Sequence, residues 1–75
     1  MNAFQLHVDC EIKRARKKHA PLNSAHEGYA VILEELDEFW EEVRKKREAR
    51  NKQAMYNELV QIAAMAQRTA EDVLG

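Results

Sequence analysis

Seven carboxylates lie within sixteen residues of this 75-residue chain, between positions 27 and 42. They are Glu27, Glu34, Glu35, Asp37, Glu38, Glu41 and Glu42, and the densest part reads Glu-Glu-Leu-Asp-Glu over residues 34–38. Like charges three or four residues apart on a helix repel each other, which destabilises it by roughly 0.2–0.5 kcal/mol per pair. The run is therefore either a solvated face balanced by neighbouring lysines and arginines, or a surface that binds something positive.

Apolar residues around the carboxylates predict a helix over residues 25–47. They recur at the 3.6-residue period and comprise Tyr29, Ile32, Leu33, Leu36, Phe39, Trp40 and Val43. If this stripe faces the core, a helix advancing about 100° per residue places Glu35, Glu38 and Glu42 on one ridge beside it. Glu34 falls at the back of the helix. Glu35 and Glu38, one turn apart, then present their oxygens together.

A second helix, predicted over residues 52–74, carries a carboxylate at the border of an apolar surface. That surface comprises Met55, Leu59, Ile62, Ala63, Ala66, Ala70 and Val73. Glu58 borders it, and Gln61 follows one turn later. If the two helices pack antiparallel, the pairs Glu35–Glu38 and Glu58–Gln61 can converge. Oxygen ligands suit Mg²⁺, which polarises phosphoryl oxygens and lowers the pKa of bound water.

The same residues also allow a purely structural interpretation. Glu41–Lys45 and Glu42–Lys46 are i,i+4 pairs in the favourable order. Acidic residues early in a helix and basic residues late in it also complement its dipole. Glu58 is harder to explain in this way, because an unpaired charge beside an apolar surface is costly.

Capping residues mark where the helices begin. Asn2 predicts the start of a helix over residues 3–18. Ser24 and Glu27 form a capping box at the start of the acidic helix, which gives Glu27 a structural role. Asn51 predicts the start of the third helix.

These elements predict an all-α fold with a single domain over residues 1–75. The subunit is expected to be a three-helix antiparallel arrangement. Three helices of this length do not cover so much apolar surface alone, which favours assembly into an oligomeric helical bundle, a homodimer or homotetramer. Gly28 weakens its helix by about 1 kcal/mol relative to alanine, and close approach of another backbone or a ligand would explain it.

Composition narrows the function classes. The chain has 12 basic and 13 acidic residues and a formal net charge of −1, so no global field recruits nucleic acid or an anionic membrane. Cys10 is the only cysteine, which excludes an internal disulfide and a thiolate-rich zinc site. A reducing, cytoplasmic location fits this, and we expect Cys10 to be a small core residue. The sequence shows no membrane-spanning run and no secretion signal.

Two motifs together resemble a known family. Residues Glu34-Glu35-Leu36-Asp37-Glu38 are followed, after nineteen residues, by Glu58-Leu59-Val60-Gln61. This order resembles the E-E-x-x-E … E-x-x-D signature of the MazG-like all-α nucleoside triphosphate pyrophosphohydrolases. The flanking segments are similar to the small phage or mobile-element members, so the resemblance covers roughly residues 24–73.

The resemblance implies an enzyme that hydrolyses nucleoside or deoxynucleoside triphosphates to monophosphate and pyrophosphate. It implies Mg²⁺ as the cofactor, with Mn²⁺ as a second suitable ion, in dimers or tetramers of helical subunits. Glu35, Glu38 and Glu58 would be metal ligands, with Gln61 at a fourth ligand position. Glu34 and Glu38 would act in catalysis, and Glu34 would bind the metal or position water.

Gln61 departs from the signature, which has aspartate at this position. An amide offers a carbonyl oxygen but no negative charge, so the site would hold Mg²⁺ more weakly. Three outcomes stay open: an active enzyme with a changed ligand set, a weak enzyme, or a non-catalytic helical oligomerisation or interaction module. Asp72 lies three turns further on and cannot replace the missing carboxylate.

A basic joint follows the acidic helix. It includes Lys46, Arg47, Arg50 and Lys52. A solvated helix end is the favoured interpretation, and contact with a substrate triphosphate or with nucleic acid are the alternatives. Phe39 and Trp40 are expected to pack in the core rather than stack on a base. His19 and His26 flank a proline loop and make a weak metal pair.

Overall fold

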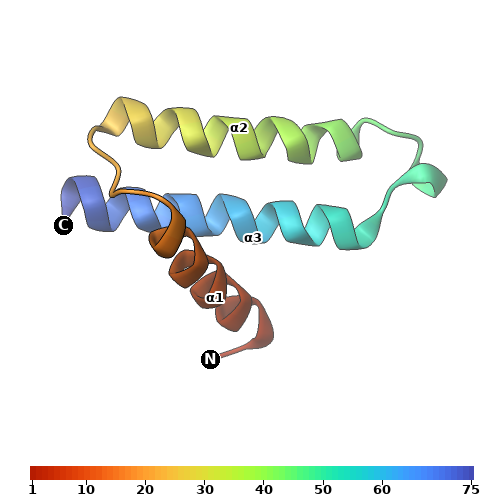
Figure 1. The fold of residues 1–75 in the computed structure, drawn as a ribbon. Helices are drawn as coiled ribbons and strands as arrows, with labels where there is room; N and C mark the ends of the chain where they lie inside the picture. The colour runs from red at the N-terminus through yellow and green to blue at the C-terminus, as the bar shows by residue number, and fades with distance from the viewer.

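The computed structural model describes all 75 residues, and every element in it is helical. In chain order the elements are α1 (Ala3–Lys18), α2 (Ala25–Val43), the 3-10 turn η1 (Arg47–Ala49), α3 (Lys52–Thr69) and the π-helical turn η2 (Ala70–Leu74). Helices α2 and α3 lie side by side and antiparallel, and α1 runs diagonally across α3 (Figure 1). The predicted all-α class is confirmed. None of these helices combines the length and apolarity that crossing a membrane requires.

The expected caps form at all three helix starts. Asn2 and Gln5 make a reciprocal capping box, with both hydrogen bonds at 2.8 Å. Ser24 Oγ accepts the Glu27 N–H at 3.1 Å, but the Glu27 carboxylate accepts the N–H of Asn23 and not that of Ser24, so the predicted capping box forms only in part. The side chain of Asn51 caps α3. Because these side chains satisfy backbone N–H groups that a helix start leaves free, they fix where each helix begins.

Helix α2 ends at Val43, four residues before the predicted end. The joint that follows satisfies its last turn: the Arg50 guanidinium donates to the Val43 carbonyl at 2.7 and 3.0 Å. The Glu42 carboxylate accepts the Asn51 N–H at 2.6 Å and the Lys45 ammonium at 2.9 Å. The predicted i,i+4 ion pairs of Glu41 and Glu42 are therefore wrong. Both residues instead make i,i+3 pairs.

Helix α3 packs against both α1 and α2 and so forms the centre of the core. The buried cluster comprises Val8, Ile12 and Ala15 of α1 and Val60, Ala64 and Met65 of α3. Ala64 has no exposed surface, and Val31 and Ile32 of α2 pack against the same cluster. The small side chains of Ala15 and Ala64 let the helices approach closely. Helix α3 is therefore buried on more than one side.

The apolar stripe of α2 divides into two faces. Ile32 and Phe39 are partly buried, and Ile32 packs against the core. Leu36 is 47% exposed and Trp40 is 55% exposed. The prediction that Trp40 is a core residue is wrong, and Leu36, in the middle of the stripe, does not face the core either. The stripe is wider than the surface with which α3 can cover it, so its outer half is exposed in the single chain.

Polar contacts join the C-terminal end of α1 to η2. Arg16 pairs with Glu71 at 2.8 Å and with Asp72 at 2.9 Å. Asp72 also accepts the Leu22 N–H at 2.9 Å. That N–H and the Arg16 guanidinium hold the pKa of Asp72 below its usual value. Asp72 is thus bonded to Arg16 of α1 and to the α1–α2 loop.

Cys10 is exposed, so the prediction of a core cysteine is wrong. The core positions of α1 are Val8, Ile12 and Ala15. A residue two positions after Val8 is turned by about 200° around the helix and faces outward.

Gly28 gives the closest test of the α2–α3 packing. A Cβ added there would lie 2.4 Å from Thr69 Cγ2 and 2.6 Å from Thr69 Oγ1, and this hydroxyl is held by the Met65 carbonyl. We expect Gly28→Ala to lower the free energy of unfolding by about 1–2 kcal/mol, because overpacking outweighs the better helix propensity of alanine. Urea unfolding followed by circular dichroism measures the change.

Thr69→Ala in the Gly28→Ala background is the matched control. It removes both atoms of closest contact and leaves Thr69 Cβ at 3.1 Å, so it should recover part of the loss. If Gly28→Ala raised the free energy of unfolding, the close packing at Thr69 would be refuted.

Candidate functional site

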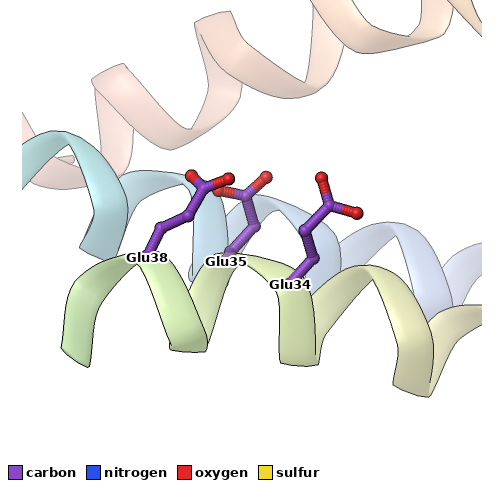
Figure 2. Close-up of side chains that lie close together, drawn as sticks. All are labelled: Glu34, Glu35 and Glu38. Atoms are coloured by element: carbon purple, nitrogen blue, oxygen red, sulfur yellow. The ribbon is translucent and has the colours of Figure 1, made fainter. Parts of the chain in front are cut away.

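Three glutamates of α2 bring their carboxylates together. Oxygens of Glu34, Glu35 and Glu38 lie within 4.8 Å of one another. Figure 2 shows all three side chains extending from α2 to one side, toward α1. Glu34 was expected at the back of the helix; its long side chain instead brings its carboxylate into the cluster. A cation would offset the repulsion among three such charges.

Helix α3 adds a fourth carboxylate, Glu58, against this cluster. Its carboxyl group interacts with those of Glu35 and Glu38, so the part of the expected convergence that involves Glu58 is present. Its Oε2 atom is buried and has no hydrogen-bond partner. Buried polar atoms in folded proteins are nearly always paired, so this oxygen has an unmet need for a donor or a cation.

Burial and mutual repulsion raise the pKa values of the two inner carboxyls. Desolvation, together with Glu58 and the charge of Glu38, raises the pKa of Glu35 to about 8. Desolvation is also the main cause of the raised pKa of Glu58. The pair therefore holds a proton at neutral pH when no cation is present.

A cleft of about 480 Å³ lies beside the cluster, between α1, the α1–α2 loop, α2 and α3. Glu34 and Glu35 line one part of it. Its other polar residues are Glu11, Arg14, His19, Glu27, Gln61 and Arg68, and its apolar lining is Ala15, Ala20, Leu22, Val31 and Met65. The cleft exists because α1 and α2 both pack on α3 but contact each other little. Clefts that combine apolar walls with a few convergent polar groups are the usual form of small-molecule sites.

Gln61 faces α1 as well as α2. It lines the cleft with Glu35, and its side chain interacts with Glu11. Glu11 accepts two hydrogen bonds from Arg14, at 2.6 and 2.9 Å, and these contacts are the main cause of its lowered pKa. Position 61 thus lacks a charge of its own but lies beside a carboxylate from another helix.

The basic joint lies elsewhere in the molecule. Its four basic residues are exposed in and around the α2–α3 connection: Lys46, Arg47, Arg50 and Lys52. None of them lines the cleft. Arg50 is already bonded to the carbonyl of Val43. The cleft is lined by residues from the other part of the hairpin. Figure 1 shows that α2 begins and α3 ends on that side.

Two cleft residues were not singled out from the sequence. Glu11 looked like an ordinary residue of a charged helix, and nothing in its spacing connects it to Gln61. Arg68 offered a weak signal, because it is a lone cation close to the apolar, alanine-rich part of α3. In the structure it is the one buried charged residue.

Comparison with family profiles, curated proteins and solved structures yields no match to this chain. The relation to the MazG-like enzymes therefore stays a prediction that rests on the two motifs.

The carboxyl cluster should make the stability of the metal-free protein depend on pH. A pKa that is about 8 in the folded chain and near 4.5 in the unfolded chain means that folding takes up a proton between these values. The free energy of unfolding should therefore fall as pH rises from 5 to 9 in EDTA. Thermal melts across this range test the prediction.

Glu35→Gln should largely remove this slope, because the amide stays neutral at every pH. Glu41→Gln is the matched control, since Glu41 is an exposed residue of the same helix. Equal slopes in the wild type and in Glu35→Gln would contradict the assignment.

Proposed function

We propose that this chain is a Mg²⁺-dependent hydrolase that converts nucleoside or deoxynucleoside triphosphates to monophosphate and pyrophosphate in the cytoplasm. The observation that carries the proposal is the convergence of Glu34, Glu35 and Glu38 of α2 with Glu58 of α3 at the edge of a cleft. The two sequence motifs supply the substrate class. The carboxyl cluster supplies the need for a divalent cation.

The residues fit such a cation. Mg²⁺ takes oxygens at 2.0–2.1 Å, so its ligand oxygens lie about 3–4 Å apart, and small side-chain rotations bring the cluster into that range. The unpartnered Oε2 of Glu58 would gain a ligand bond. Mn²⁺, which accepts the same oxygen ligands, would also suit the site. When bound, the ion would neutralise charge on the phosphoryl oxygens of the substrate.

The exposure of each carboxylate suggests whether it would bind the cation or activate water. Glu35 and Glu58 are partly buried and are placed to hold the cation between α2 and α3. Glu34 is exposed and lines the cleft, so its carboxylate can orient a water molecule and accept its proton. The water oxygen would join phosphorus as the bond to the pyrophosphate leaving group breaks. Glu38 lies between these roles, within reach of both Glu34 and Glu35.

A second candidate function is a non-catalytic helical interaction module. It is favoured by Gln61, which leaves the signature one negative charge short, and by the exposed apolar face of α2. The two functions differ in whether the carboxyl cluster binds Mg²⁺ and whether nucleotides are turned over.

Release of pyrophosphate from a panel of ribo- and deoxyribonucleoside triphosphates tests the enzyme directly. We expect Mg²⁺-dependent turnover that Glu38→Gln lowers roughly 100-fold or more, since metal assistance contributes several kcal/mol to such reactions. Circular dichroism should show unchanged helix content in this variant.

Glu41→Gln is again the control, and it should keep the full rate because its side chain is exposed and pairs only with Arg44. Absence of turnover with every nucleotide, together with no Mg²⁺-dependent rise in melting temperature, would leave the interaction module as the better account.

We also propose that the subunit forms a homodimer or homotetramer through α2. Its outer face carries Tyr29, Leu33, Leu36 and Trp40, all more than a third exposed and spaced by four, three and four residues. This spacing is typical of helices that pair along an apolar seam. Leu59 of α3 is also exposed. Soluble proteins rarely leave such a contiguous row of large apolar side chains uncovered.

Leu36→Glu should shift the protein toward monomer, because it places a charge in the centre of this seam. Sedimentation equilibrium measures the mass against the 8.7 kDa of one chain. Leu74→Glu is the control, since Leu74 is exposed but lies outside α2, and it should leave the assembly intact. A wild-type protein that sediments as a monomer at tens of micromolar would refute the proposed assembly.

A further inference from the structure

Arg68 of α3 is a buried charge without a counter-ion. It is 3% exposed and forms none of the ion pairs in the structure. Its Nε atom has no hydrogen-bond partner. Its other contacts are weak: one terminal nitrogen donates to Met65 Sδ at 3.6 Å and the other to the Ala20 carbonyl at 3.3 Å. Guanidinium has five N–H donors, so most of its bonding capacity is unused.

Asp72, whose pKa the charge of Arg68 helps to lower, does not supply the missing partner. Arg68 contributes only weakly to the lowered pKa of Asp72, after the Leu22 N–H and Arg16. Both oxygens of Asp72 are already engaged by those two groups, at 2.9 Å each. A buried cation normally needs a close, well-oriented partner, because desolvation is otherwise uncompensated. The arginine is thus in an environment that favours an added anion.

The arginine also lines the cleft beside the carboxyl cluster. Acidic and basic residues of the cleft lining come from different elements. Glu34 and Glu35 belong to α2, whereas Arg68 lies near the end of α3 and His19 lies in the α1–α2 loop. Arg14, a further cation in the lining, is neutralised by Glu11. Arg68 is therefore the buried cation of this cleft that has no acidic partner.

We propose that Arg68, with His19 beside it in the cleft lining, forms a binding subsite for a phosphoryl group of the ligand. A guanidinium presents parallel N–H donors that match two phosphate oxygens, and such charge-assisted bonds are strong. The identification of the anion as phosphate rests on the proposed nucleotide substrate. The substrate's phosphate chain would then lie between a cation at the glutamates and the guanidinium of Arg68. This assignment places phosphate recognition in the cleft and not at the basic α2–α3 joint.

Binding of inorganic pyrophosphate, measured by calorimetry in Mg²⁺ and again in EDTA, tests the subsite. We expect Arg68→Gln to weaken binding about 10- to 100-fold, because it removes charge-assisted hydrogen bonds. Arg68→Lys should weaken it less, because the charge stays but the paired donors are lost. Lys46→Gln, at the basic joint, is the matched control and should change affinity less than about twofold.

A measurement on the wild-type chain covers the case in which the Arg68 variants do not fold. The Nε–H resonance of Arg68 in ¹H–¹⁵N spectra should shift when pyrophosphate is added, since this N–H has no internal partner. Unchanged affinity in a folded Arg68→Gln protein, loss of affinity in Lys46→Gln, or an Nε–H resonance that does not move would each overturn the subsite.

The subsite and the proposed enzyme can fail separately. Pyrophosphate binding in EDTA that depends on Arg68, without any binding of Mg²⁺ alone, would support the subsite and count against the enzyme. Nucleotide turnover that is lost in Glu38→Gln and unchanged in Arg68→Gln would support the enzyme and overturn the subsite.

Discussion

The packing of two helices on one shared partner determines the rest of this molecule. Helix α3 buries one side against α1 and another against α2, and its central alanine, Ala64, has no exposed surface. Because α1 and α2 contact each other so little, a cleft opens between them. Close approach at Gly28 and Thr69 sets the position of α2 on α3, and thereby the distance between the carboxylates of the two helices. A core of this size stabilises a chain only marginally, so each of these contacts matters.

The same packing creates an electrostatic cost. Holding Glu35, Glu38 and Glu58 together in a partly desolvated position raises the pKa values of Glu35 and Glu58 and leaves Glu58 Oε2 unpartnered. Arg68, a buried cation without an acidic partner, is a second unfavourable electrostatic feature, in this case of a positive charge. Burial normally leaves neither a carboxylate nor a guanidinium without a partner. Unpaired charges of both signs in and beside one cleft are what the proposed ligand, a divalent cation with a phosphate chain, would compensate.

The sequence predicts local features such as helix starts well, and contacts between helices less well. Asn2, Ser24 and Asn51 gave the helix starts, because a cap acts within three residues of itself. Periodicity predicts the apolar stripe of α2 but not the part of it that α3 covers, so it does not predict the exposure of Leu36 and Trp40. The convergence of Glu35 with Glu58 followed from antiparallel packing. Arg68 could not be assigned, because its burial depends on a loop and a helix crossing that no spacing encodes.

The two faces of α2 allow assembly and ligand binding to occur together. A helix turns by about 100° per residue, so the exposed stripe centred near Leu36 and Trp40 lies roughly half a turn from the centre of the carboxylates at Glu34, Glu35 and Glu38. A second subunit seated on the stripe would therefore cover apolar surface without closing the cleft. It would also hold straight the helix that carries three of the four carboxylates, and so help to keep like charges within a few ångströms of one another. Assembly would in this way supply stability that a three-helix core lacks, at the point where the proposed site needs it.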